Sequence, residues 1–199
     1  MSCIVGACLA ALTAFGTTTV AANAESVPIP VPSDGVVAEP AAQSAPVLLT
    51  GSTKASYFWD DASGRMGDTG LPAIGKPMQK GLFASPSWPL GTEGYVLYKG
   101  KKAPFFIGDR GPGIPSNSGV MLDIDGKTFA ELTGGSFNDS TLTVQGFDAG
   151  HIKVDYVVTK WGSGKGKKNH PVPFSSGAWA VFDRNPATPP RTPVVLAGN

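Results

Sequence analysis

The sequence predicts a mainly β protein that folds as a small barrel with a short helix. Two observations lead to this fold class. Glycine and proline contribute 26 and 18 of the 199 residues, a proportion that favours short strands and frequent turns over long helices. The apolar runs between the turns are short and rich in β-branched and aromatic residues, as is typical of strands. Many short strands with one small helix favour a β-barrel.

The strands are expected at six apolar runs. In chain order these are residues 55–59, 94–100, 103–109, 119–124, 140–146 and 151–161. The last run alternates apolar and polar residues, as expected for a strand with one face in water. Residues 125–135 differ, because Phe129 and Leu132 have helical spacing and two glycines follow. This pattern predicts a helix of one or two turns with a glycine stop.

The first 24 residues have the pattern of a secretory signal peptide. An apolar run extends from Cys3 to Ala22, and a small-x-small sequence ends at Ala24, where we expect cleavage. No Lys or Arg precedes the run, which departs from the usual pattern, and a buried helix is the alternative interpretation. Both cysteines, Cys3 and Cys8, lie in this segment, so the mature chain would have no disulfide and no thiolate metal site.

Two proline-rich segments flank the predicted domain. Residues 25–54 contain five prolines and little aromatic mass, which indicates an extended linker, with a recognition ligand as the alternative. Residues 184–199 have a similar composition and are expected to form a tail. Residues 55–183 hold every Trp and Tyr and are long enough to enclose one hydrophobic core. After the N-terminal segment, no apolar run is long enough to cross a bilayer.

Two aspartates are candidate functional residues because of their position in this pattern. Asp109 ends an apolar run and is followed by Arg110 and a Gly-Pro-Gly sequence, so we expect it at a strand end where glycines leave room for a ligand. Asp123 lies inside an apolar strand, where a carboxylate must be hydrogen-bonded or border a cleft. A structural role in a turn is the alternative for Asp109. Asp125 is expected to cap the short helix.

Three segments resemble, in order, the double-psi β-barrel proteins of the rare lipoprotein A and expansin kind. Residues 71–78 are similar to the early Ala-Ser-Gly turn of that family, residues 83–101 to its Leu-Pro-Phe-Gly-Thr strand entry, and residues 105–135 to its Asp-Arg-Gly-Pro segment with the strand and helix that follow. The resemblance covers about residues 55–162. It implies a six-stranded double-psi β-barrel with one or two short helices and an open groove for a β-linked glycan.

The resemblance also implies site residues. Asp109 and Asp123 would be the catalytic carboxylates, one of them protonated so that it can donate to the glycosidic oxygen. The expected substrate-binding residues are Tyr57, Trp59, Ser85 and Arg110. Ser85 stands near the place of a histidine that lytic members carry, so the resemblance leaves open whether the protein cleaves a glycan or only loosens it. Asp60 and Asp61 are expected to be solvated turn acids, and residues 162–170 a flexible basic loop.

Two other functions stay open. Secreted chitosanases with a Gly-Asp-Thr-Gly-Pro segment are also similar around residues 96–113, although their second glutamate has no clear counterpart here. A non-enzymatic inhibitor or interaction protein could use the same barrel. The formal net charge of +1 gives no reason to expect a nucleic-acid partner. We therefore expect a secreted monomer, possessing no cofactor, metal or membrane span, that binds, loosens or cleaves a β-1,4-linked glycan such as peptidoglycan or chitosan.

Overall fold

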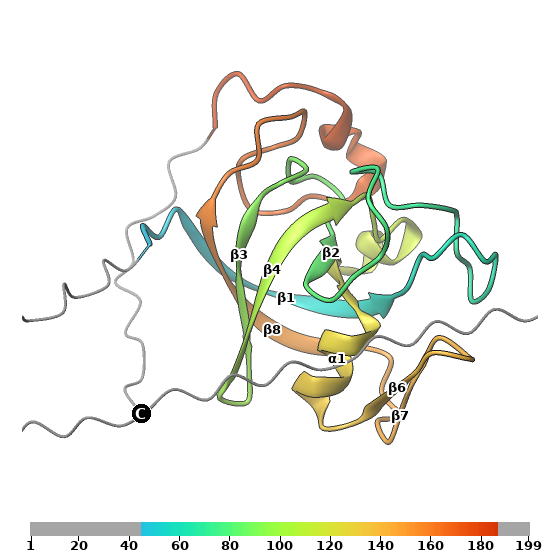
Figure 1. Ribbon diagram of the computed structural model, residues 1–199. Coiled ribbons are helices and arrows are strands. Elements are labelled where there is room, and N and C mark those ends of the chain that lie inside the picture. The colour runs from blue at the N-terminus through green and yellow to red at the C-terminus, as the bar shows by residue number, and fades with distance from the viewer. Residues whose placement is uncertain (1–44, 187–199) are drawn as a thin grey trace, which may run out of the picture. The chain divides into compact units, whose positions relative to one another are not determined.

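The computed structural model describes residues 45–186, and its centre is a closed six-stranded β-barrel (Figure 1). The barrel strands are β1 (Leu49–Phe58), β2 (Leu82–Ala84), β3 (Glu93–Tyr98), β4 (Lys101–Asp109), β5 (Val120–Asp125) and β8 (Ile152–Lys160). They follow the order β1-β5-β2-β4-β3-β8, and β8 pairs back with β1. The β1–β5 and β2–β4 pairs are parallel and the others antiparallel. The prediction of a mainly β fold with a six-stranded barrel is confirmed.

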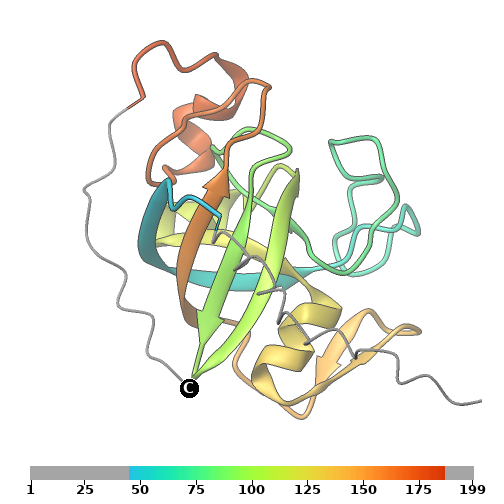
Figure 2. The ribbon, with the colours of Figure 1, turned by 60° about the vertical axis from the view of Figure 1, so that its left-hand side comes forward.

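The remaining elements lie at the two ends of the barrel. They are η1 (Ile114–Ser118), α1 (Gly126–Thr133), β6 (Ser136–Asn138), β7 (Thr143–Gln145), η2 (Phe174–Ser176) and η3 (Ala178–Ala180). Figures 1 and 2 show α1 with the β6–β7 hairpin at one end, while the chain after β8 covers the other end. Within residues 45–186, no helix has both the length and the apolar character needed to cross a membrane.

The helix α1 forms as the local sequence predicts. Asp125 precedes it, and its Oδ1 accepts a hydrogen bond from the Thr128 backbone N–H at 2.9 Å. Gly134 ends the helix in the left-handed conformation with φ of 82°, which glycine adopts without steric cost. The buried face includes Phe129 and Leu132, which pack against the barrel. Both the cap and the glycine stop are confirmed.

The core is filled from inward-facing positions of every barrel strand. Ile152, Val154 and Tyr156 alternate with the exposed Lys153 and Asp155 in the first part of β8, as predicted for a strand with one face in water, whereas Val157 and Val158 are both buried. Trp88 is fully buried and stacks on Phe105 with 6.2 Å between ring centroids. The barrel therefore holds one continuous hydrophobic core, with aromatic rings at its centre.

The observed strands differ from the predicted ones in their boundaries, their place in the fold and their number. The strand β1 begins at Leu49 instead of Ala55, and residues 49–54 pair with β8, so the end of the predicted linker belongs to the barrel. Residues 140–146 contribute β7, which lies outside the barrel. The strand β2 was not predicted because it has only three residues. The predicted signal peptide and residues 25–44 of the linker lie outside the described residues, as does the tail from residue 187 on.

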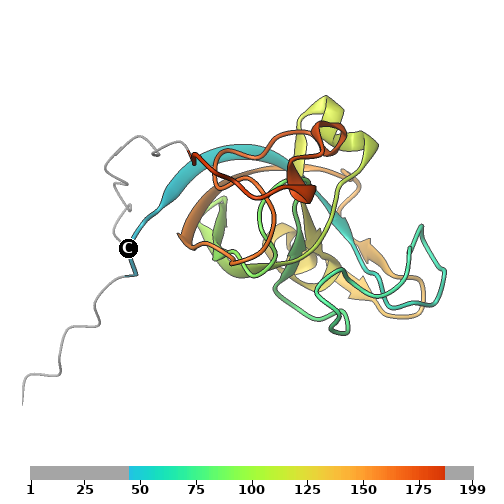
Figure 3. The ribbon, with the colours of Figure 1, turned by 90° about the horizontal axis from the view of Figure 1, so that it is seen from above.

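The chain after β8 is anchored to the barrel end. The backbone N–H of Lys167 donates to Ser87 O at 2.8 Å, and that of Gly166 donates to Val181 O at 2.8 Å. Figure 3 shows this segment lying across the barrel, beside the turn that contains η1. There the Phe174 N–H donates to Ser116 Oγ at 3.0 Å. Residues 162–170 form a loop, as predicted, and the hydrogen bonds of Gly166 and Lys167 attach its middle to the rest of the protein.

Candidate active site

The two predicted catalytic aspartates lie on the strands that flank β2. Ala84 of β2 pairs with Asp109 of β4 on one side and with Asp123 of β5 on the other. Adjacent strands are about 4.8 Å apart, so the Cα atoms of the two aspartates are roughly 10 Å apart. The negative charge of Asp109 raises the pKa of Asp123, which shows that the two carboxyl groups interact. The short strand β2 thus brings together two residues that are fourteen positions apart in the sequence.

Small residues lie next to the Asp123 carboxylate. Ala84 separates the two aspartates with a methyl group only. A Cβ atom placed on Gly111 would lie 3.3 Å from Asp123 Oδ2 and 3.6 Å from the Ala84 Cβ. Gly111 therefore packs closely against the carboxylate, and a larger residue at this position would crowd it.

Asp123 retains its proton more strongly than an ordinary aspartate. Its pKa is raised to about 6, mainly by burial and in part by the charges of Asp60 and Asp109. A hydrogen bond from Ser56 Oγ to Asp123 Oδ1 opposes this rise. Ser56 is in position for this bond because it pairs with Asp123 across β1 and β5. A carboxyl group with this pKa can donate a proton in mildly acidic to neutral solution.

Asp109 is held at the end of β4 by the chain that precedes β2. The Ala73 backbone N–H donates to Asp109 Oδ1 at 2.8 Å, and the Ile74 N–H donates to Gly108 O at 2.9 Å. Burial raises the pKa of Asp109, while hydrogen bonds from the Ala73 and Arg110 backbone N–H groups and the Arg110 charge lower it. One Asp109 oxygen is thus fixed by the protein backbone.

Asp60 is a third member of the site, and the expectation of a solvated turn acid is wrong for it. Its pKa is raised to about 6, mainly by burial and in part by the charges of Asp109 and Asp68. Thr69 Oγ1 donates to Asp60 Oδ2 at 3.3 Å, which lowers the pKa in part. We call Asp60, Asp109 and Asp123 the acid cluster. No local sequence signal identifies Asp60, because its neighbours in the cluster come from other strands.

Asp61, unlike Asp60, has the surroundings of a turn acid on the surface. Its Oδ2 lies 2.9 Å from Arg65 Nη2 in an exposed ion pair. The pKa of Asp61 is lowered mainly by the Ser63 side chain. The Ser63 backbone N–H, which donates to Asp61 Oδ1 at 3.1 Å, and the Arg65 charge lower it further. Asp61 is therefore a turn acid and does not belong to the acid cluster.

Tyr57 does not line the site, contrary to the prediction. Successive side chains of a strand face opposite sides, so Ser56 faces Asp123 while Tyr57 faces the core. The Tyr57 ring packs on Phe129 with 4.9 Å between centroids, and its hydroxyl accepts a hydrogen bond from the Val144 N–H at 3.3 Å. Its contacts are those of a structural residue that joins the barrel to α1.

Ser85 is also placed differently from the prediction. The residue is fully buried, and its Oγ accepts hydrogen bonds from the Trp88 and Ser87 backbone N–H groups at 3.0 and 3.3 Å. These bonds shape the turn that carries Trp88 into the core. A substrate cannot reach a hydroxyl that is buried in this way, so Ser85 supports the fold instead of contacting a ligand.

Trp59 packs against the hairpin beside α1. Its ring lies 4.8 Å from the Phe137 ring, and the Lys127 Nζ lies 4.9 Å from the Trp59 ring centroid. Trp59 is only partly exposed. It is adjacent in sequence to Asp60 of the acid cluster, but its ring contacts are with Lys127 of α1 and Phe137 of the hairpin.

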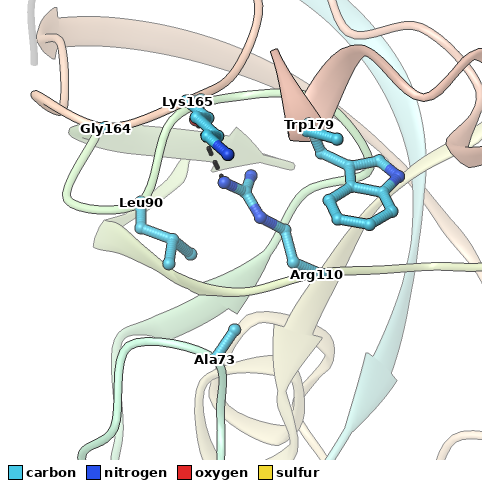
Figure 4. A pocket seen from close by; sticks show the side chains of 7 residues that line it. Ala73, Leu90, Arg110, Gly164, Lys165 and Trp179 are labelled. Atoms are coloured by element: carbon cyan, nitrogen blue, oxygen red, sulfur yellow. Dashed lines mark hydrogen bonds between the residues drawn. The ribbon is translucent and has the colours of Figure 1, made fainter. Parts of the chain in front are cut away.

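Arg110 lines a pocket next to the acid cluster. This pocket has a volume of about 380 Å³ and is lined by Ala73, Leu90, Arg110, Gly164, Lys165, Trp179 and Ala180 (Figure 4). We call it the Arg110 pocket. It adjoins the acid cluster through Ala73, which lines the pocket and hydrogen-bonds Asp109. Sequence reasoning missed Trp179 and Lys165, because only the anchored chain after β8 brings them to Arg110.

In residues 45–186, no group of three or more His, Cys, Asp or Glu side chains is arranged to hold a metal ion. The acid cluster presents three carboxyl groups with raised pKa values, and the Arg110 guanidinium lies beside Asp109. Searches with the sequence found no matching protein-family model and no matching curated protein.

Proposed function

We propose that the protein acts on a β-1,4-linked glycan outside the cell and that the acid cluster is its reaction site. The observation that carries this proposal is the placement of Asp109 and Asp123 on either side of Ala84, with the pKa of Asp123 raised to about 6. Cleavage of a glycosidic bond uses a protonated carboxyl group that donates to the leaving oxygen and an ionised one that activates water or stabilises the sugar cation.

In this proposal Asp123 is the proton donor. Its burial and its acidic neighbours keep it protonated at a pH where an ordinary aspartate is ionised, and Ser56 orients it. Asp109 takes the role of the ionised partner: burial raises its pKa, and the backbone N–H groups and the Arg110 charge limit that rise. Cα atoms roughly 10 Å apart are compatible with the carboxyl separation of about 6.5–9.5 Å that inverting hydrolysis uses.

The same donor would serve a protein that loosens a glycan without cleaving it. The burial of Ser85 favours this second action, because no side chain at that position can take over the work of the histidine found in lytic relatives. Both actions place the glycan over Asp123. The predicted signal peptide supports a secreted location, and the target polymers would be peptidoglycan or a chitosan-like glycan.

The test is incubation of the mature protein with purified peptidoglycan and with chitosan, followed by mass spectrometry of the soluble products. A parallel assay measures the extension under load of a film of the same polymer. We expect one of the two activities in the wild type and a loss of about a hundredfold or more in Asp123→Asn.

A matched control is Asp155→Asn. Asp155 accepts a hydrogen bond from Ser52 Oγ across β1 and β8, which reproduces the Ser–Asp pair of the site on an exposed part of the barrel wall. We expect Asp155→Asn to retain full activity. Absence of both activities in the wild type on both polymers would overturn the proposed function and favour an interaction protein.

A further inference from the structure

The Arg110 pocket has a chemistry that the acid cluster does not use. We propose that it binds the carboxylate of an acidic sugar unit, a hexuronate, in the chain of the glycan. The identification of the ligand as part of a glycan rests on the proposed function, whereas the affinity for a carboxylate follows from the pocket itself. The protein would then select a β-1,4-linked glycan that carries hexuronate units, a class of polymer different from the peptidoglycan and chitosan-like glycans named above.

Arg110 has free hydrogen-bonding capacity in this pocket. Its guanidinium donates to Trp88 O and, at 3.1 Å, to Lys165 O. Both acceptors are neutral carbonyl groups, and an arginine has five N–H donors, so three remain without an acceptor among the described residues. Asp109 is near enough to influence Arg110 electrostatically, but the two residues form no ion pair. A ligand carboxylate would supply the missing charged acceptor.

The guanidinium is held in position before any ligand arrives. Lys165 O, one of its two acceptors, belongs to the loop that the Gly166 and Lys167 backbone N–H groups anchor. The loop also packs closely on the barrel, because a Cβ atom on Gly166 would lie 2.5 Å from Pro89 N. Little conformational freedom is therefore lost when a ligand pairs with Arg110, which favours binding.

The walls of the pocket suit a sugar ring. Leu90, Trp179 and two alanines are apolar, and Figure 4 shows Arg110 between Leu90 and the Trp179 indole. The indole stacks on Phe174 with 5.2 Å between ring centroids, which fixes its orientation. An apolar C–H face of a sugar can pack on these walls while its carboxylate meets Arg110. The volume of about 380 Å³ is within the range of about 300–1,000 Å³ that is usual for small-ligand sites.

The location links the pocket to the reaction site. Ala73 lines the pocket, and its backbone N–H donates to Asp109 Oδ1. A glycan that crosses the acid cluster can therefore place a neighbouring sugar unit in the Arg110 pocket. The negative charges of the acid cluster would repel a hexuronate carboxylate, whereas the positive charge of Arg110 would attract it. The hexuronate would therefore bind in the Arg110 pocket and not over the acid cluster.

The test is isothermal titration calorimetry with a β-1,4-linked glucuronate trisaccharide and, for comparison, a β-1,4-linked glucose trisaccharide. We expect the acidic trisaccharide to bind at least about tenfold more tightly, because a hydrogen bond to a charged group contributes more than a neutral one. Arg110→Gln should abolish the difference. Lys153→Gln, which removes one positive charge from an exposed position on β8, should leave it unchanged.

A second pair of variants tests binding without altering Arg110, which also holds two backbone carbonyls. Ala180→Glu places a negative charge at the pocket wall, and Ala180→Gln adds a similar volume without charge. We expect the glutamate to weaken binding of the acidic trisaccharide about tenfold relative to the glutamine. Equal binding by the two variants, with both folded, would overturn the proposal.

Two further ligands test whether the pocket recognises a sugar acid or any carboxylate. Free acetate or a peptide with an acidic C-terminus that bound as tightly as the trisaccharide would overturn the proposal, because the sugar ring would then contribute nothing. Asp123→Asn should still bind the acidic trisaccharide. Equal affinity of the wild type for acidic and neutral trisaccharides would refute the pocket proposal even if the protein cleaves a glycan. Binding without cleavage or loosening would refute the proposed function alone.

Discussion

Asp109 and Asp123 lie on opposite sides of β2, and the negative charge of Asp109 raises the pKa of Asp123. This relationship places two acids that compete for protonation at one end of a rigid barrel. Burial is the main reason why the pKa of Asp123 rises to about 6, whereas backbone hydrogen bonds and the Arg110 charge limit the rise in the pKa of Asp109. The predictions below follow from the energetic consequences of this arrangement.

Asp123→Asn should increase the stability of the folded protein above pH 6. The pKa of Asp123 is higher in the folded state than in the unfolded chain, so its contribution to stability is present below pH 4 and is lost as the pH rises through about 6. Asparagine carries no charge and can still accept the Ser56 hydrogen bond. The expected gain is about 1–3 kcal/mol at pH 8, measured by urea denaturation of both proteins.

Asp125→Ala should destabilise the protein, in contrast to Asp123→Asn. Asp125 is fully buried, and its carboxylate accepts hydrogen bonds from the Thr128 and Gly81 backbone N–H groups at 2.9 and 2.7 Å. Its loss should lower stability by about 2–4 kcal/mol, because a helix cap and a second backbone partner disappear. A structural role for Asp123 would give the same sign, and a destabilised Asp123→Asn protein at pH 8 would contradict our assignment.

Asp60→Asn should lower the pKa of Asp123. The charge of Asp60 is one of the groups that raise that pKa, so its removal makes ionisation of Asp123 easier. If Asp123 acts as the proton donor, the alkaline limb of the pH–activity profile should move to lower pH. NMR titration of the aspartate carboxyl carbons measures the same shift directly.

The control for this experiment is Asp61→Asn. Asp61 is adjacent in the sequence but pairs with Arg65, and it does not appear among the groups that shift the pKa of Asp123. We expect the pH–activity profile of Asp61→Asn to match that of the wild type. An equal shift in both variants would mean that the effect reflects overall charge and not the geometry of the acid cluster.

Gly111→Ala should reduce activity more than it reduces stability. The added Cβ would stand 3.3 Å from Asp123 Oδ2, a tight contact that displaces the carboxylate and narrows its access. Gly150→Ala is the matched control, since a Cβ there meets nothing within 4 Å. Activity and melting temperature are measured for both variants. Wild-type activity in Gly111→Ala would show that the space beside Asp123 is not used.

A fragment of residues 45–186 should be as stable as the full mature chain, whereas residues 55–162 alone should be much less stable. The shorter fragment lacks the half of β1 that pairs with β8, and it lacks the segment bonded to Ser87 and Trp88. Circular dichroism melting curves of the two fragments test this. Coincident melting curves would show that the flanking residues contribute nothing to the fold.

Local features of the fold could be predicted from the sequence because their causes are local. The cap Asp125 and the stop Gly134 act on the backbone within one turn of α1, so the pattern of nearby residues suffices. The alternation of β8 reports a single water-facing surface. The aspartates Asp109 and Asp123 were found for the same reason, since each is a charged residue that ends or interrupts an apolar strand.

Tertiary structure alone decided which side chains meet. Asp60 joins the acid cluster, and Trp179 reaches Arg110, through strands and loops that are distant in the sequence. Tyr57 is directed to the core because Ser56 takes the face toward Asp123, an orientation that depends on the register of β1 with β5. Register and strand order arise from the burial of the whole core, and no short segment carries that information. The sequence by itself therefore determined the fold class, most of the longer strands and the short helix, and it singled out Asp109 and Asp123 as candidates. Packing determined the short strand β2 and which side chains surround the two aspartates.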